Sequence, residues 1–253
     1  MGVYEPCQPG TGVSLKCLVL AAGYGTRMAE VTGNIPKALI KLGGMTILDH
    51  LLQKLAELDV DVHLVTNDRF MPQFRTWFDE SAQSLKMISD GSTHVENRLG
   101  ATGDLAFAIR TFGFKDDLLV VAADNLLNFS MKGMLAEFLQ FREVMLAVRR
   151  NSSMEDQTRR GVVELATDGI IKHFQEKPDN PASLMMAAPL YMIPKDLLPE
   201  IDHYLSIGGN PDAPGYLMEY LVSNHIVRGW QIPGEIVDVG NPASYSQALD
   251  RFT

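Results

Sequence analysis

A glycine-rich loop followed by two cations is the first part of the sequence whose residue types suggest chemistry. Residues 20–28 read LAAGYGTRM, and Pro36-Lys37 follows shortly after. Glycines at such a turn let backbone N–H groups approach a ligand closely. The Arg27 guanidinium and the Lys37 ammonium could converge on a polyphosphate. The loop matches neither GxGxxG, because Met28 occupies the third glycine's place, nor GxxxxGK[ST]. A structural turn with two solvated cations is the alternative interpretation.

Two aspartates at the ends of apolar runs are candidate ligands for a metal. Asp124 closes the run 117–124, and Asp238 stands just before Gly240 at the end of another short stretch. The carboxyl ends of parallel strands open onto one crevice, so Asp124 should face the same space as the glycine loop. Two carboxylates together with substrate phosphates suit Mg²⁺, which keeps several of its waters. Each aspartate could also be a helix N-cap or a turn residue.

Apolar periodicity predicts the elements that must position these residues. Short apolar runs alternate with segments of helical apolar spacing, which indicates βαβ units. In the C-terminal half, a hairpin turning at Asp168-Gly169 adds antiparallel strands. The expected fold class is α/β, with a Rossmann-like, mixed but mainly parallel sheet flanked by helices and an antiparallel elaboration in the C-terminal half. Strands are expected at 16–23, 60–66, 85–88, 117–124, 161–175 (the hairpin), 186–193 and 235–239, and helices at 47–58, 104–112, 131–141, 195–205, 216–224 and 242–251.

Composition and terminal sequence bound the class of protein. Of the 253 residues, 46% are hydrophobic and 21% are charged, which is ample for a sizeable core. Residues 1–12 are expected to form a mobile lead-in, and 13–253 a single domain. The net charge of −9 argues against nucleic-acid binding. With no secretory signal, no apolar run of about 20 residues and no zinc-type cysteine spacing, we expect a cytoplasmic protein without membrane contact.

The glycine loop carries a resemblance to a known family. LAAGYGTRM at 20–28, with PKAL at 36–39, resembles the signature of the sugar-phosphate nucleotidylyltransferases, also called nucleotide-sugar pyrophosphorylases. It is similar in particular to glucose-1-phosphate thymidylyltransferase-like proteins. Further segments resemble later motifs of that family in the same order, so the likeness extends from about Ser14 over nearly the whole chain. These segments are RLGATG at 98–103, VVAADN at 120–125, GVVE at 161–164, EKP at 176–178 and VDVGNP at 237–242.

The resemblance implies an activity and a set of site residues. It implies a nucleotidyltransferase domain over 13–253 that joins an NTP to a sugar 1-phosphate, a phosphorylated small-molecule acceptor. The products would be an NDP-sugar and pyrophosphate, formed by Mg²⁺-dependent in-line attack without a covalent intermediate. Catalysis is expected from Arg27, Lys37, Asp124, Lys177 and Asp238, with the two aspartates as metal ligands. Nucleotide binding is expected from Leu20, Ala21, Ala22, Gly23, Gly25, Thr26, Arg27, Lys37, Asn97, Arg98 and Gly100, and acceptor binding from Asn125, Gly161, Glu176 and Lys177.

Departures from the family pattern leave both substrates open. Glu30 stands where the family has a proline, and Ala188-Pro189 replaces a Thr-Gly or Ser-Gly pair of hexose enzymes. The second change puts the identity of the acceptor in question. No glutamine stands at 98–103, where some thymidylyl and uridylyl enzymes use one, although Asn97 and Arg98 could substitute. For the nucleotide we favour a pyrimidine.

Other functions are compatible with parts of the sequence. A cytidylyltransferase for a non-hexose phosphorylated or phosphonate acceptor is the nearest rival in the same class. A catalytically silent regulatory protein that binds nucleotide sugars would be favoured by loss of the arginine, the lysines or the aspartates, all of which are present. A dinucleotide-dependent dehydrogenase is disfavoured by the missing third glycine. A homo-oligomer is compatible with the sequence.

Overall fold

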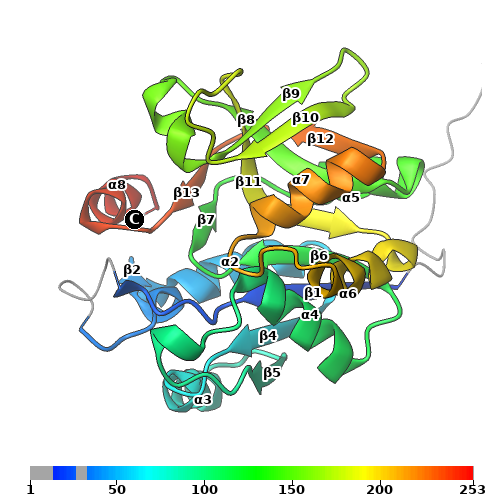
Figure 1. The fold of residues 1–253 in the computed structure, drawn as a ribbon. Helices are drawn as coiled ribbons and strands as arrows, with labels where there is room; N and C mark the ends of the chain where they lie inside the picture. Colours follow the sequence, from blue (N-terminus) through cyan, green and yellow to red (C-terminus); the bar gives the residue numbers. More distant parts are fainter. Residues whose placement is uncertain (1–13, 27–32, 253) are drawn as a thin grey trace, which may run out of the picture.

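One mixed β-sheet forms the centre of the molecule. The computed structural model describes residues 14–26 and 33–252, and nine strands of this described part join the sheet. Its first half is parallel and runs in the order β6 (Asp117–Ala122), β1 (Leu15–Leu20), β4 (Asp61–Thr66), β5 (Lys86–Ser89) (Figure 1). All four strands end at the same edge of the sheet, where the glycine loop leaves β1.

The second half of the sheet is mostly antiparallel. The strand β11 (Met185–Ile193) runs antiparallel to β6, to β8 (Val144–Arg150) and to β9 (Gly161–Leu165). Two further strands complete it: β10 (Ile171–Glu176), which forms a hairpin with β9, and β12 (Val227–Gln231), which lies parallel to β8. The register of β11 shifts where Pro189 lies, because proline has no N–H to donate to the ladder.

Two cores lie on opposite faces of the sheet. In β1, Cys17 and Val19 face one core and Leu18 faces the other, because successive side chains of a strand point to opposite sides. Figure 1 shows α4 and α6 together on the near side. The first core is covered by α2 (Ile47–Ala56), α3 (Met71–Glu80) and α5 (Lys132–Phe141), and the second by α4 (Ala101–Phe112), α6 (Pro199–Ser206) and α7 (Pro214–Asn224).

A small third core lies beside the end of the main sheet. It packs α8 (Pro242–Phe252) against two short antiparallel sheets. These sheets pair β7 (Asn125–Leu127) with β13 (Ile236–Asp238), and β2 (Lys41–Leu42) with β3 (Met45–Thr46). The core residues are Leu42, Ile47, Leu126, Val239 and Ala248. This core holds the C-terminal strand β13 next to the segment that follows β6.

The start of α2 shows how local sequence positions the crevice. Thr46 accepts a hydrogen bond from the Asp49 N–H (3.0 Å), and Asp49 accepts one from the Thr46 N–H (2.9 Å), which makes a capping box. Asp49 also accepts a hydrogen bond from the Trp77 indole (3.1 Å), which ties α2 to α3. The helix packs against the 3₁₀ helix η2 (Lys37–Leu39). Packing against α2 therefore fixes the backbone of Lys37.

The expected fold class is confirmed, and the structure adds several elements to it. The expected strands, the hairpin and the helices are present, although the helix expected at 104–112 begins at Ala101 and the one at 195–205 splits into η5 (Lys195–Leu197) and α6. Sequence reasoning did not predict α3, β8 or β12, nor the short strands β2, β3 and β7. The expected lead-in at 1–12 lies outside the described residues. Among the helices of the described chain, none has the length and apolar character needed to span a membrane.

Candidate active site

Polar residues at the end of β4 hold the carbonyl groups of the glycine loop. Thr66 Oγ1 donates to the Ala21 carbonyl (3.3 Å), and Asn67 Nδ2 donates to the Ala22 carbonyl (2.9 Å). Both donor residues are completely buried. The loop is therefore shaped by the protein before a ligand arrives. Sequence reasoning missed Thr66 and Asn67, although two polar residues at the end of a predicted strand, at the same sheet edge as the loop, were a usable signal.

Gly25 lets the aliphatic part of Lys37 pass along the loop. Its φ is +60°, and a Cβ at this position would lie 3.3 Å from Lys37 Cγ. The left-handed φ and the close contact both favour glycine. Thr26 is exposed at the rim of the crevice. Arg27, which was expected to take part in catalysis and in nucleotide binding, lies outside the described residues.

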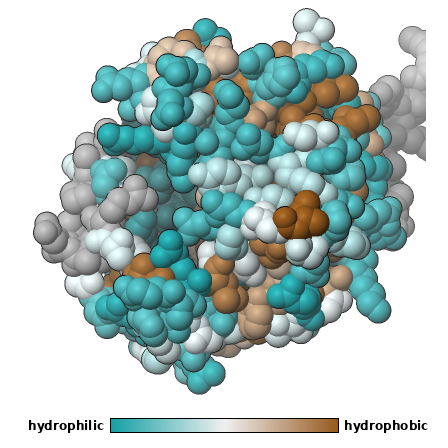
Figure 2. Space-filling model, viewed as in Figure 1, coloured by the Kyte–Doolittle hydropathy of each residue, from teal (hydrophilic) through white to brown (hydrophobic). Residues whose placement is uncertain are grey.

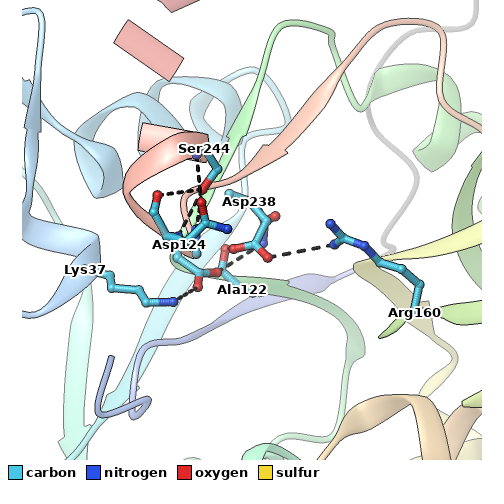
Figure 3. A network of polar contacts seen from close by, with 9 residues as sticks. Lys37, Ala122, Asp124, Arg160, Asp238 and Ser244 are labelled. Carbon is cyan, nitrogen blue, oxygen red and sulfur yellow. Dashed lines mark hydrogen bonds and ion pairs between the residues drawn. The ribbon is translucent and has the colours of Figure 1, made fainter. Parts of the chain in front are cut away.

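Four charged side chains meet at one corner of the crevice. Figure 3 shows Asp124 and Asp238 next to each other, with Lys37 on one flank and Arg160 on the other. Lys37 Nζ lies 3.4 Å from Asp124 Oδ2, and Arg160 Nη1 lies 3.9 Å from Asp238 Oδ2. Arg160 was not expected here; it directly precedes the predicted motif at 161–164. The crevice thus brings Lys37 together with both predicted aspartates.

The pairing of β7 with β13 brings the two aspartates together. Asp238 lies opposite Asn125 in the antiparallel register, and the Val239 N–H donates to the Asp124 carbonyl (3.0 Å). Asn125 is buried, and its Nδ2 lies 3.4 Å from Asp124 Oδ1. A Cβ on Gly240 would lie 3.1 Å from Asp238 Oδ1. Asn125 therefore contacts the Asp124 carboxylate in this structure, and its contact with an acceptor is a proposal.

The two carboxylates suit a hard divalent cation. Burial and the neighbouring Asp238 raise the pKa of Asp124, and Lys37 opposes them. Extra positive charge here would therefore be favourable. In the described part of the chain, no three His, Cys, Asp or Glu side chains gather as a ready-made cage. A two-carboxylate set fits Mg²⁺, which takes its other ligands from water and substrate phosphates, and Asp124 and Asp238 are the residues that would hold it.

A second loop covers the N-terminus of α4. Gly100 has a φ of +82°, and a Cβ there would overlap the Pro211 carbonyl oxygen. The N–H groups of Ala101 and Thr102 donate to the carbonyls of Asp212 (3.1 Å) and Pro211 (2.9 Å). The turn-rich segment at 208–215 therefore packs onto the predicted nucleotide loop.

The two polar residues expected to read the base are engaged with the protein. Asn97 Oδ1 accepts hydrogen bonds from the N–H groups of Thr93 and His94, both at 3.1 Å. Arg98 donates from Nη2 to Asp212 Oδ1 (2.9 Å). Of the two, only Arg98 lines one of the crevice's described cavities. Recognition of the base by either side chain stays a proposal, and Arg98 would first have to leave Asp212.

Three of the four predicted acceptor residues, Gly161, Glu176 and Lys177, lie together at the end of β10. Gly161 and Gly215 both lie against the carboxylate of Glu176, where a Cβ on Gly215 would overlap it. Burial raises the pKa of Glu176, and Lys177 opposes this effect. Lys177 Nζ lies 3.3 Å from Glu176 Oε1, and the Lys177 N–H donates to the Arg160 carbonyl (3.0 Å). The backbone therefore links the acceptor motif to the corner of Asp124 and Asp238.

Two adjoining cavities occupy the crevice. One has a volume of about 210 Å³ and is lined by Lys37 and Asp124 among mostly small apolar residues. The other, about 470 Å³, is lined by residues 22–26 together with Arg98 and Asp212. Figure 2 shows the surface hollowed at its left, in the region where Figure 1 shows β7 and β13, with a mostly hydrophilic rim. Such a space suits a small molecule with charged groups.

A family comparison shows to which family the chain belongs. The nucleotidyl transferase family model matches residues 16–253. The chain belongs to the nucleotidyl transferase family. The match runs from Lys16, within β1, to the end of the sequence and includes every residue of the crevice named above. The family resemblance predicted from the motifs is therefore confirmed.

Several relatives of this chain are longer proteins. A protein of Sulfolobus acidocaldarius described as a mannose-1-phosphate guanyltransferase is 31% identical over 236 residues, which cover 91% of this chain and 61% of that protein. The UTP–glucose-1-phosphate uridylyltransferase of a Synechocystis species is 25% identical over 248 residues, covering 93% and 62%. The bifunctional protein GlmU of Methanocaldococcus jannaschii is 25% identical over 229 residues, covering 90% and 52%. The chain therefore spans between 52% and 62% of the length of these relatives.

Solved structures share the nucleotidyl transferase fold. UDP-glucose pyrophosphorylase complexed with UDP-glucose matches with a TM-score of 0.80 at 17% identity, covering 95% of this chain and 98% of that one. UTP-bound UGPase from Acinetobacter baumannii matches with a TM-score of 0.76 at 16% identity, covering 95% and 93%. At these identities the likeness establishes the fold.

Proposed function

We propose that this chain is a sugar-phosphate nucleotidyltransferase, which transfers a nucleotidyl group from an NTP to a sugar 1-phosphate and releases pyrophosphate. The observation that carries the proposal is the corner in Figure 3, where Lys37 from the nucleotide side contacts Asp124, beside Asp238 and Arg160. Family membership supports the reaction class. Two of the relatives are named for guanylyl and uridylyl transfer, which adds to that support.

The proposed reaction exchanges one phosphorus–oxygen bond for another. An oxygen of the acceptor phosphate attacks the α-phosphorus of the NTP in line and forms a new P–O bond. The bond from the α-phosphorus to the oxygen that bridges to the β-phosphorus breaks, and pyrophosphate leaves with that electron pair. Because both substrates are anions that repel each other, the rate depends on positioning and on neutralisation of charge.

Cations of the crevice are proposed to hold the phosphates. Lys37 binds the triphosphate, and Lys177 binds the acceptor phosphate. Arg160 adds a guanidinium between these two, since its side chain reaches Asp238 and its carbonyl accepts from the Lys177 N–H. By resemblance, Arg27 balances charge on the leaving pyrophosphate.

Carboxylates of the crevice have two separate proposed tasks. Glu176, enclosed by Gly161 and Gly215, accepts hydrogen bonds from sugar hydroxyls. Asp124 and Asp238 hold Mg²⁺, which when bound supplies Lewis-acid neutralisation of the phosphate charge. Arg160 and Lys37 balance these two carboxylates in the ligand-free protein.

A substrate matrix tests the proposed function. The purified chain is incubated with Mg²⁺, each common NTP and each of several sugar 1-phosphates or other phosphorylated acceptors, and pyrophosphate is measured. We expect release that needs both substrates, with a pyrimidine NTP favoured as the sequence predicts. Release confined to CTP and a non-hexose acceptor would select the cytidylyl alternative. Binding of nucleotide sugars without release in any pair would overturn the proposal in favour of a regulatory protein.

A further inference from the structure

One buried carboxyl group in the crevice has no part in the roles above. Asp104, in the first turn of α4, lines both cavities of the crevice and is only 6% exposed. Its Oδ1 atom has no hydrogen-bond partner within the described residues. Buried polar atoms are nearly always paired in native structures. An unpaired carboxyl oxygen at a cavity wall therefore indicates a hydrogen-bond donor that the ligand brings.

A second carboxyl group holds Asp104 from the protein side. Asp90 accepts hydrogen bonds from the N–H (2.7 Å) and the Oγ–H (2.9 Å) of Ser92, which in turn accepts one from the Tyr24 hydroxyl (2.9 Å). Burial, the charge of Asp90 and a hydrogen bond to it raise the pKa of Asp104 to about 8. At neutral pH a proton is thus held between the two carboxyls, which leaves an Asp104 oxygen as an acceptor.

The surroundings of Asp104 suit the base of a nucleotide. A pair of acidic groups repels phosphate, which Lys37 and the other cations attract. Ala22, Gly23 and Ala101 line both cavities together with Asp104, so small side chains flank the carboxyl and leave room for a flat ring. The part of the ligand that reaches Asp104 must also carry an N–H or O–H donor.

We propose that Asp104 selects the nucleotide by accepting a hydrogen bond from an exocyclic amino group of the base. The inference rests on the proposed function and names its donor substrate more closely. In cytosine, an amino group projects where uracil and thymine carry a carbonyl oxygen, which would face the carboxyl oxygen without a hydrogen between them. Where the carboxyl oxygen meets position 4 of the ring, rather than the N3–H of uracil or thymine, Asp104 therefore selects cytosine among the pyrimidines. Purine bases with an amino group are the other candidates.

Nucleotide pairs that differ in one amino group test this role. CTP and UTP form one pair, GTP and ITP a second, and ATP and ITP a third. Their affinities for the full chain with Mg²⁺ are measured by calorimetry without acceptor, for wild type, Asp104→Ala and Asp104→Asn. We expect wild type to prefer the amino-bearing member of at least one pair by roughly tenfold or more. Asp104→Ala should abolish that preference, whereas Asp104→Asn, which keeps an acceptor oxygen, should retain it.

The outcomes separate this inference from the proposed function. A preference that survives in Asp104→Ala, or wild-type affinities equal within each pair, would overturn base reading by Asp104. Loss of affinity by the same factor for both members of a pair would place the carboxyl on the ribose, which also overturns it. An amino-group preference lost only in Asp104→Ala, in a protein that releases no pyrophosphate, would support the inference and contradict the proposed function. The thermal melting of each variant confirms that it folds.

Discussion

Asp124 has Asp238 and Lys37 as charged neighbours, and its negative charge is proposed to hold the metal ion. We expect Asp124→Asn, which keeps the shape and removes the charge, to lower kcat by roughly 100-fold or more. The melting temperature should change little, because burial and Asp238 already raise the pKa of this carboxyl and a neutral group is tolerated there. Pyrophosphate release measures the rate, and Asp79→Asn, at an exposed position of α3, is the control. Turnover within a few-fold of wild type would contradict the assignment.

Lys177 lies on the acceptor side of the crevice. The variant Lys177→Ala should therefore impair the use of the acceptor and not of the NTP. The lysine contacts Glu176, and its N–H is bonded to the Arg160 carbonyl. Removing a charge-assisted contact to phosphate should raise the KM for the acceptor by about tenfold or more and leave the KM for NTP nearly unchanged. Steady-state kinetics with each substrate varied in turn would show the split. Lys172→Ala, exposed on the same strand β10, is the control, and an effect confined to the NTP would argue against this role.

Asp104 should make the stability of the ligand-free protein depend on pH. Its pKa is raised from the ordinary 3.8 to about 8 in the folded chain, so the unfolded chain binds fewer protons between these values. Stability therefore falls as the pH rises from about 4 to about 8. The side chain of Asp104→Asn is neutral at every pH. The melting temperature of this variant minus that of wild type should therefore rise across this pH range, by several degrees at its upper end. A difference in melting temperature that stays constant from pH 5 to pH 8.5 would contradict the raised pKa of Asp104.

Individual site residues were predictable where the local sequence indicates them. Lys37, Asp124 and Asp238 stand in motifs with glycine or apolar neighbours that already suggest a crevice. Asp104 also left a signal, an acid at the start of a predicted amphipathic helix. Its burial is seen only in the structure. Arg160 left none, because its contact with Asp238 exists only when a loop of the antiparallel half meets β13.

At the level of elements, the junction between α4 and the loop at 208–215 is open to a matched test. Gly100→Ala places a Cβ against the Pro211 carbonyl in a backbone region (φ +82°, ψ 158°) that only glycine readily adopts. Gly113→Ala, at the other end of the same helix, has a similar φ of +68° but open space around it. We expect Gly113→Ala to cost about 1–2 kcal/mol without a change in NTP affinity. Gly100→Ala should cost more and weaken NTP binding; equal behaviour of the two variants in melting and calorimetry would refute the contact's role.

Elements with a clean period were predicted, and those stabilised by distant contacts were not. The helix expected from 104 begins at Ala101, because the carbonyls of Pro211 and Asp212 accept from its first N–H groups, and no local pattern contains that support. The strand β12 includes Gly229, which weakens a strand pattern but fits here because a Cβ would press on Leu165. By contrast, α3 has apolar residues at helical spacing and could have been predicted.

At the scale of the whole molecule, the crevice joins segments from both halves of the chain. Asp124 follows β6 of the parallel half, whereas Asp238 belongs to β13 near the C-terminus, and the β7–β13 pairing brings them together. The protein carries a net charge of −9, yet cations face this corner from separate elements, Lys37 from η2 and Arg160 from the segment before β9. A metal ion bound by Asp124 and Asp238 together with a nucleotide would therefore connect the segment after β6 with β13.

The melting temperature should therefore report the metal site directly. An NTP at 100 times its Kd stabilises the fold by about 2.7 kcal/mol, and we expect Mg²⁺ to enlarge the NTP-induced rise and EDTA to remove that increment. In Asp238→Asn the NTP should still raise the melting temperature, because Lys37 and the glycine loop are intact, but the increment from Mg²⁺ should largely disappear. Asp79→Asn, far from the crevice in sequence and exposed, should keep the full increment. A magnesium increment that persists in both Asp238→Asn and Asp124→Asn would mean that the cation is bound by the nucleotide alone. That result would contradict the proposed role of the two carboxylates as its ligands.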